Sequence, residues 1–214
     1  MVFTLEWNTV GDFIYRVTAI DSITSGRTKL IGVVAAKKSK LTKVTVPNTA
    51  NFKGYGLNVT EVGDNAFKAM KKLKKVTFGA NVKIIGKAAF SNCKKLNKIN
   101  FKNVTTIGNN AFAGCKALKK LTIGSKVTTI GKNAFKKCTK LKTVVMGKSV
   151  KTINAKAFTK DNKIKKITFK GKKLKTVKKN ALSSKVKKNI KTKKTKLKGN
   201  KKAIKVFKKK LKIK

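Results

Sequence analysis

A short repeat, with a period of roughly 23 residues, governs the middle of this 214-residue chain. Its clearest marker is an alanine followed by phenylalanine, which recurs at a nearly constant spacing. The marker phenylalanines are Phe67, Phe90, Phe112, Phe135 and Phe158. One unit of this length cannot close a hydrophobic core, so neighbouring units must stack and share one. The repeat therefore predicts an elongated solenoid.

Other apolar positions recur in step, and one unit reads V-x-x-I-G-x-x-A-F-x-x-C-x-x-L-x-x-V-x-F. Five good copies span residues 58–170, and a decayed sixth follows with Leu182 at the phenylalanine position and Lys178 at the glycine position. The aliphatic residues before the phenylalanine are Val62, Ile85, Ile107, Ile130 and Ile153, and those after it are Leu73, Leu96, Leu118, Leu141 and Ile164.

Each unit contains three local patterns. Residues 74–78 alternate polar and apolar side chains, which predicts a half-buried strand. Residues 59–63 predict a second short extended piece that ends in a glycine turn. Residues 65–73 place apolar side chains at i, i+3 and i+6, which predicts a short helix or 3₁₀ turn. The recurring glycine predicts a tight turn with positive φ; this position holds Gly63, Gly86, Gly108 and Gly131, and then Asn154.

The L-x-x-V-x-F and I-G-x-x-A-F-x-x-C-x-x-L phrases resemble the BspA-like class of leucine-rich repeats, which is typical of bacterial surface antigens. The resemblance implies a right-handed solenoid with a parallel sheet on its concave side. It also implies a non-enzymatic role in adhesion or protein recognition, outside the cell or on its surface. Residues 9–20 and 41–62 resemble the β-hairpin-rich lead-in before such arrays, and the lysine-rich tail resembles their terminal cap.

The sequence and the resemblance together predict three regions in the chain. Residues 1–57 form a β-rich N-terminal cap, residues 58–170 form five leucine-rich repeats, and residues 171–214 form the sixth repeat and a C-terminal cap. The segment 203–214 retains apolar residues at Ile204, Val206, Leu211 and Ile213, which favours a strand or helix that closes the core. A disordered polycation is the alternative for this tail.

The charge of the chain is extreme, because 57 Lys and Arg stand against 6 Asp and Glu, a formal net charge of +51. Such a charge attracts polyanions and opposes compaction. Non-specific nucleic-acid binding is therefore one alternative function. Specific readout is disfavoured, because only Arg16 and Arg27 are arginines and most of the phenylalanines belong to the core. A second alternative function is that of a structural spacer or a fragment of a larger surface protein.

The strand pattern also predicts which side chains face outward on the sheet. A surface of lysine and threonine suits an acidic protein or an anionic glycan or wall polymer, although an AT-rich coding background would also favour lysine. The predicted ligand-binding residues are Lys75, Thr77, Lys98, Asn100, Lys120, Thr122, Thr143, Val145, Lys166 and Thr168.

The sequence offers no catalytic, metal-binding or cofactor-binding constellation. It has no histidine. Cys93, Cys115 and Cys138 share one repeat position at a spacing unlike a zinc site, so we expect a buried cysteine ladder, with a disulfide between rungs as the alternative. The glycines fit no phosphate-binding motif, and the carboxylates Glu61 and Asp64 occur in one copy only. We therefore predict a protein that is not an enzyme.

Two observations bear on location. No apolar run approaches the length of a transmembrane helix, about 20 residues. The first residues lack the basic and apolar regions of a signal peptide. The chain is then either cytoplasmic, or a mature part or fragment of a surface protein that has lost its leader.

Overall fold

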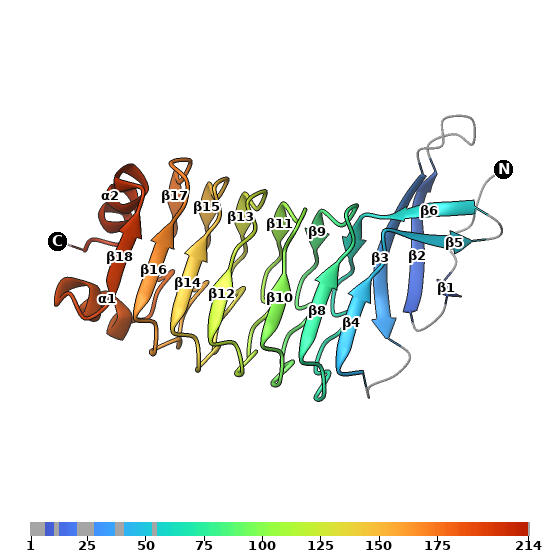
Figure 1. Ribbon diagram of the computed structural model, residues 1–214, viewed down its shortest axis with the longest axis horizontal. Coiled ribbons are helices and arrows are strands. Elements are labelled where there is room, and N and C mark those ends of the chain that lie inside the picture. The colour runs from blue at the N-terminus through green and yellow to red at the C-terminus, as the bar shows by residue number, and fades with distance from the viewer. Residues whose placement is uncertain (1–6, 11–12, 21–27, 37–40, 53–54, 214) are drawn as a thin grey trace.

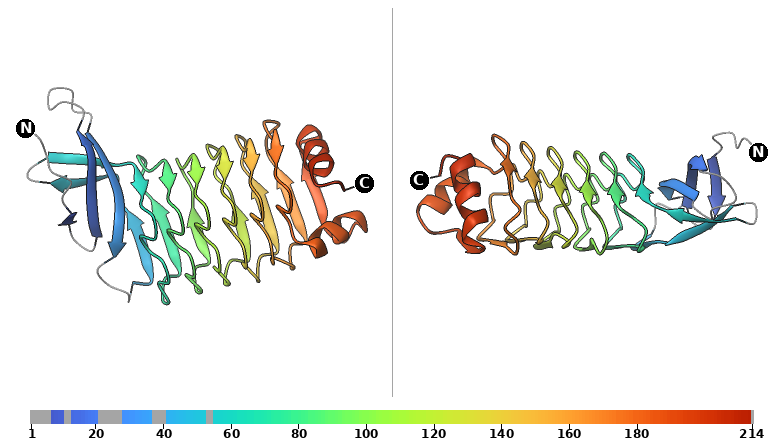
Figure 2. Two further views of the ribbon diagram at one scale, coloured as in Figure 1. Left: turned by 180° about the vertical axis from the view of Figure 1, so that it is seen from behind. Right: turned by 90° about the horizontal axis from the view of Figure 1, so that it is seen from above.

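The computed structural model describes the chain except residues 1–6, 11–12, 21–27, 37–40, 53–54 and 214. It is a parallel β-solenoid with an antiparallel β-cap at the N-terminal end and two helices at the C-terminal end (Figure 1). Each rung contributes one strand to a front layer and one to a back layer, and turns connect the layers (Figure 2). The predicted solenoid is confirmed.

The front layer contains the strands that the alternating pattern predicts. It divides into two parallel sheets, ordered β10-β8-β4 and β12-β14-β16-β18. Its strands are β4 (Lys43–Val46), β8 (Lys75–Phe78), β10 (Lys98–Asn100), β12 (Lys120–Thr122), β14 (Thr143–Met146), β16 (Lys166–Phe169) and β18 (Lys196–Gly199).

The back layer is continuous from the N-terminal cap to the last rung. Its two-residue strands pair in parallel, and each ends in an aliphatic side chain that is buried in the core. These return strands are β7 (Glu61–Val62), β9 (Ile84–Ile85), β11 (Thr106–Ile107), β13 (Thr129–Ile130), β15 (Thr152–Ile153) and β17 (Thr176–Val177).

The segment 65–73, expected as a short helix or 3₁₀ turn, forms a series of single turns. The N–H of Lys68 donates to the carbonyl oxygen of Asn65 at 2.9 Å. Asn65 and Ala69 both have a φ of 59°, and a left-handed residue every four positions stops a helix from propagating. Phe67, Met70 and Leu73 are nevertheless all buried, as their spacing predicts.

The prediction of positive φ at the repeated glycine is wrong. In this part of the rung the left-handed residues come two positions later, at Asn110 and Asn133, each with a φ of 57°. The glycine is required by close packing instead, because a Cβ on Gly131 would lie 2.5 Å from the carbonyl carbon of Gly108 in the rung before it. The spacing of the rungs therefore selects this glycine.

The core is a ladder of like residues. The rings of Phe67, Phe90, Phe112, Phe135 and Phe158 stack with centroids 5.0–5.5 Å apart and planes within 7° of parallel. Each ring is at most 1% exposed. Burying a residue of this size stabilises the fold by roughly 1.5–3 kcal/mol before conformational entropy is counted.

The N-terminal strands pair mostly in antiparallel fashion. Strands β1 (Trp7–Val10), β2 (Phe13–Ile20) and β3 (Thr28–Ala36) pair in order, and β5 (Thr49–Phe52) forms a hairpin with β6 (Tyr55–Val59). Strand β3, however, pairs in parallel with β6 and with β7, so the cap continues the back layer.

The C-terminal residues fold as a cap made of α1 (Ser184–Lys191), β18 and α2 (Lys201–Lys210). The side chains of Ser183 and Asn200 cap the two helices by accepting hydrogen bonds from backbone N–H groups. Phe207 on α2 is buried, with its ring centroid 5.0 Å from that of Phe169. The tail is therefore packed against the core. Its buried residues Ala203 and Phe207 lie four positions apart on one side of helix α2.

Candidate functional site

All ten predicted binding residues lie on front strands and are exposed or half-buried. Strand register arranges them in two columns along the solenoid. Lys75 pairs with Lys98, and Lys120 pairs with Thr143 and through it with Lys166. The second column holds Thr77 and Asn100, then Thr122, Val145 and Thr168.

The structure extends this face by one strand at each end. Strand β4 adds Lys43 and Thr45, and strand β18 adds Lys196 and Lys198. Sequence reasoning missed β4 although its signal was present, because Leu41, Val44 and Val46 repeat the L-x-x-V-x-F spacing with a valine at the last position. We use "front face" below for the outward side chains of these seven strands.

The front face is interrupted between β10 and β12, which belong to different sheets. On either side the ladder is regular: Asn97 N–H donates to Lys74 O at 2.9 Å, and Lys142 N–H donates to Lys119 O at 2.8 Å. At the break, Ala117 N–H donates instead to Lys94 O at 3.1 Å. The back strands β9, β11 and β13 remain paired behind this point, so only the front of the solenoid opens (Figure 1).

A one-residue deletion lies directly after β10, next to the break. The connection from the last front-strand core residue to the next valine runs Phe78–Val82, Ile123–Val127 and Met146–Val150 in three rungs, and only Phe101–Val104 here. The glycine that follows the front strand elsewhere, as Gly79, Gly124 or Gly147, is the residue without a counterpart. Strand β10 ends at Asn100, one residue earlier in the repeat than β8, and β12 ends at the equivalent Thr122 although its connection has the usual length.

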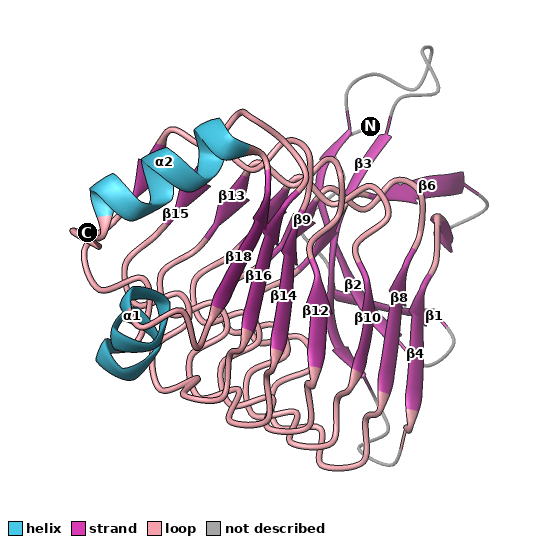
Figure 3. Cartoon of the chain, turned by 60° about the vertical axis from the view of Figure 1, so that its left-hand side comes forward, coloured by secondary structure: helices cyan, strands magenta, loops and turns pink. Residues whose placement is uncertain are grey.

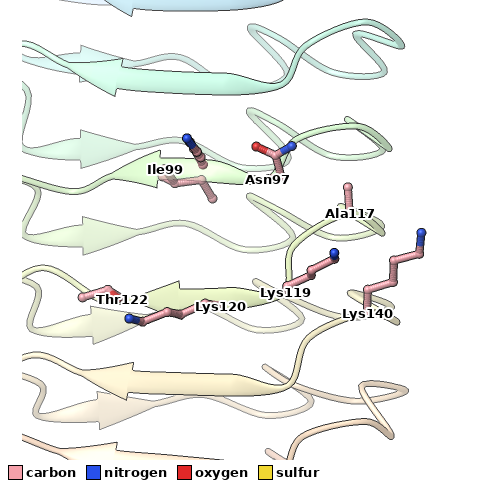
Figure 4. A pocket seen from close by; sticks show the side chains of 8 residues that line it. Asn97, Ile99, Ala117, Lys119, Lys120, Thr122 and Lys140 are labelled. Atoms are coloured by element: carbon pink, nitrogen blue, oxygen red, sulfur yellow. The ribbon is translucent and has the colours of Figure 1, made fainter.

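An open hollow of about 610 Å³ lies at this break. Its apolar floor includes Ile99, which is half-buried although the equivalent Val76 and Leu121 are at most 1% exposed. Lysines from three consecutive rungs line it (Figure 4). The lining residues are Asn97, Lys98, Ile99, Ala117, Lys119, Lys120, Thr122 and Lys140.

The hollow unites only part of the predicted site. Lys98, Lys120 and Thr122 line it, while the other seven predicted residues lie along the face on either side. Sequence reasoning missed the hollow and its apolar floor. The single signal was that Phe90 and Phe112 stand one position closer together in the sequence than the other neighbouring pairs of marker phenylalanines.

The chemistry of the hollow suits anions. Its polar side chains are ammonium groups, one amide and one hydroxyl, all of which donate hydrogen bonds. Its described lining includes no carboxylate, thiol or imidazole. Within the described residues, no group of three or more His, Cys, Asp or Glu could hold a metal ion.

The cysteines form the predicted core ladder. Cys93, Cys115 and Cys138 are free thiols with no exposed surface. Each Sγ donates to a phenylalanine carbonyl oxygen of the preceding rung, at 3.0, 3.3 and 3.4 Å. Burial raises the pKa of Cys93 to about 12 and raises the pKa of the other two. These thiols stay protonated at neutral pH, so they are packing groups and not nucleophiles.

Asp161 continues this ladder in the next rung. It has no exposed surface, and neither carboxylate oxygen has a hydrogen-bond partner. Burial raises its pKa from 3.8 to about 8, and the nearby backbone of Cys138 opposes only part of this rise. Glu61, half-buried at the other end of the array, has its pKa raised by burial and by the nearby Asp64. None of these carboxylates lines the hollow.

Sequence comparison identifies a BspA type leucine rich repeat region in six copies over residues 58–196. No curated protein matches the chain. Neither helix in the described part of the chain is long and apolar enough to span a bilayer.

Solved structures share the fold. A leucine rich cell surface protein of Faecalibacterium prausnitzii A2-165 superposes with a TM-score of 0.61 at 25% identity, over 86% of this chain and 53% of its own. The pneumococcal vaccine antigen PcpA superposes with a TM-score of 0.61 at 18% identity, over 92% and 48%. The T. pallidum leucine rich repeat protein TpLRR superposes with a TM-score of 0.56 at 20% identity, over 90% of this chain and 98% of its own. The chain thus spans about half the length of the first two proteins.

Proposed function

Because the chain belongs to the family of BspA-type leucine-rich repeat proteins, we propose that it is a non-enzymatic binding module of the bacterial surface-protein type whose front face binds a linear anionic glycan. The hollow between β10 and β12 is the principal contact, and the lysine and threonine columns extend it along the solenoid. The cell surface is the proposed location, in keeping with the cell-surface protein that shares its fold.

The observation that carries this proposal is the composition of the hollow. Ile99 and Ala117 supply apolar surface, and Lys98, Lys119 and Lys120 supply cationic donors to the same hollow. A sugar ring presents an apolar face of C–H groups and an equatorial rim of hydroxyl and carboxylate groups. The floor suits the ring face, and the lysines suit a uronate carboxylate or a phosphate.

The columns support a polymer over a small anion. Neighbouring strands in a sheet lie about 4.8 Å apart, which is comparable to the length of one sugar residue along a glycan chain. A linear glycan that follows the solenoid axis therefore meets a new pair of outward side chains at nearly every sugar. An acidic protein would meet the same charges without this match in period.

The experiment compares two double variants of equal net charge. Lys98→Glu/Lys120→Glu alters the hollow, and Lys87→Glu/Lys132→Glu alters exposed lysines beside the back strands. Polygalacturonate is titrated into each by calorimetry at about 0.15 M salt, where long-range attraction is largely screened. We expect the first variant to lose at least tenfold in affinity, about 1.4 kcal/mol, and the second to lose little.

Equal losses in the two variants would show that only net charge matters and would overturn the proposal. Poly-L-glutamate and duplex DNA are titrated in parallel. Tighter binding of polyglutamate than of polygalacturonate would favour an acidic protein as the partner. Tighter binding of DNA would favour the nucleic-acid alternative.

A further inference from the structure

The C-terminal end of the front layer exposes a free strand edge. Strand β18 is the last in the order β12-β14-β16-β18, and in the described part of the chain no strand pairs with its outer side. Lys196 N–H donates to Lys165 O at 2.8 Å and Asn200 N–H to Phe169 O at 2.9 Å, both toward β16. Because backbone groups alternate in direction along a strand, the N–H and C=O of Leu197 point away from β16, into the open side.

A groove lies along this free edge. Helix α1 lies near one end of β18 and helix α2 near the other (Figure 3). The groove has a volume of about 390 Å³, and residues of α1, of the connection to β18, of β18 and of α2 line it. The lining residues are Ile190, Lys193, Thr195, Lys196, Leu197, Lys198, Ile204 and Lys208.

The groove combines an apolar floor with a cationic rim. Ile190 is buried, and Leu197 and Ile204 are half-buried. Four lysines surround this floor, and the residues from Gly171 to the C-terminus include 21 lysines and no acid. A second copy of this chain would therefore be repelled from the groove, whereas an acidic segment would be attracted.

We propose that this groove binds an extended acidic peptide, which adds to the edge of β18 as a further strand. A strand edge with free N–H and C=O groups pairs with a peptide backbone. Alternate side chains of such a peptide would point to the apolar floor and to the lysine rim, so acidic and apolar residues should alternate in its sequence. A glycan could not form the backbone ladder, so the partner of this groove is a protein, although the groove shares Lys196 and Lys198 with the end of the front face.

The experiment uses a synthetic peptide of alternating aspartate and valine with a fluorescent label. Anisotropy measures its affinity for the full chain at about 0.15 M salt. Two N-methylated forms are compared, each methylated at alternate residues so that only one edge of the peptide is blocked. We expect one form to lose at least tenfold in affinity and the other to bind like the parent, because only one edge meets β18.

A protein variant provides the second measurement. Ile204→Glu places a carboxylate on the half-buried floor of the groove and should weaken binding of the parent peptide at least tenfold. Lys151→Glu, an exposed change outside the groove that removes more positive charge, serves as the control and should weaken binding less. Amide exchange should also show protection of Leu197 on binding. Equal binding of both N-methylated forms, or unchanged Leu197 exchange, would reduce the interaction to charge alone and overturn the proposal.

This proposal does not depend on the glycan site. Lys98→Glu/Lys120→Glu should leave peptide binding nearly unchanged, and Ile204→Glu should leave polygalacturonate binding nearly unchanged. If the front-face variants alone lose the peptide, the peptide binds the front face and the groove proposal fails.

Discussion

At the scale of single residues, one buried position of the repeat holds a cysteine in three rungs and an aspartate in the next, and the two side chains differ in how well burial suits them. Three cysteines at this position bury a small group that donates to the preceding rung. Asp161 places a carboxyl group there, with neither oxygen hydrogen-bonded. An ionised carboxylate without a partner is costly to bury, so the folded protein keeps Asp161 protonated.

Asp161 should make stability fall as pH rises. Its pKa is 3.8 when exposed and about 8 in the fold, so between these values the unfolded chain ionises while the folded chain does not. The free energy of unfolding should therefore decrease from about pH 4 to pH 8 and level off above, by about 1.36 kcal/mol for each unit of pKa difference. Urea unfolding at several pH values measures this slope.

Asp161→Asn is the test of that assignment. It removes the ionisable group at constant size, so we expect a gain of a few kcal/mol near pH 8 and almost none near pH 4. Asn162→Asp, which adds a carboxylate at an exposed neighbour, is the control and should not change the slope. Parallel curves for the parent and Asp161→Asn would contradict the prediction.

At the scale of elements, we expect the length of the connection after β10 to decide whether β10 and β12 pair. Inserting a glycine between Phe101 and Lys102 restores the usual spacing of the repeat, and we expect β10 and β12 to form a ladder. Covering Ile99 and pairing the strands should raise the free energy of unfolding by about 1 kcal/mol or more. Amide exchange at residues 119–121 should slow, and affinity for polygalacturonate should fall as the hollow closes.

A matched insertion controls for loop length. A glycine placed between Gly124 and Ser125 lengthens a connection that already has the usual number of residues. It should lower stability and leave the hollow unchanged. If the Phe101 insertion destabilises the protein as much as the control does, the short connection is not the cause of the break.

The same elements show what the sequence can predict. The front and back strands, the phenylalanine stack and the cysteine ladder all follow from periodicity, because each repeated apolar position must face the shared core. A helix or 3₁₀ turn is the expectation for residues 65–73 because burial at i, i+3 and i+6 is common to helices and to the single turns observed. The need for Gly131 comes from contact with the preceding rung, and a single unit carries no sign of such a contact.

The candidate site was predictable in part for a related reason. Alternation along a strand identifies outward residues such as Lys98 and Lys120, since side-chain direction is a local property. The hollow depends on how far β10 lies from β12, which is a property of two rungs together. The groove beside β18 depends on the fold of the tail. The apolar residues that alternate in the sequence of residues 203–214 could belong to a strand or a helix, and the structure shows a helix with Phe207 buried.

At the scale of the whole molecule, stacking turns every lysine position into a column of like charges. Register places Lys43, Lys75 and Lys98 in neighbouring rungs of one sheet. Two unit charges about 5 Å apart repel by about 0.8 kcal/mol in water. The net charge of +51 repeats this cost along the array. The core must outweigh it, and any agent that screens the lysines should stabilise the fold.

We therefore expect the melting temperature to rise by several degrees between about 10 mM and 150 mM sodium chloride, as the Debye length falls from about 30 to about 8 Å. Calorimetry measures the shift. Replacing Lys75, Lys98, Lys120 and Lys166 by glutamine should raise the melting temperature at low salt and reduce its salt dependence, because these four share one column. A melting temperature that stays constant over this range would mean that the columns repel too weakly to matter, and the lysines would then influence binding without destabilising the fold.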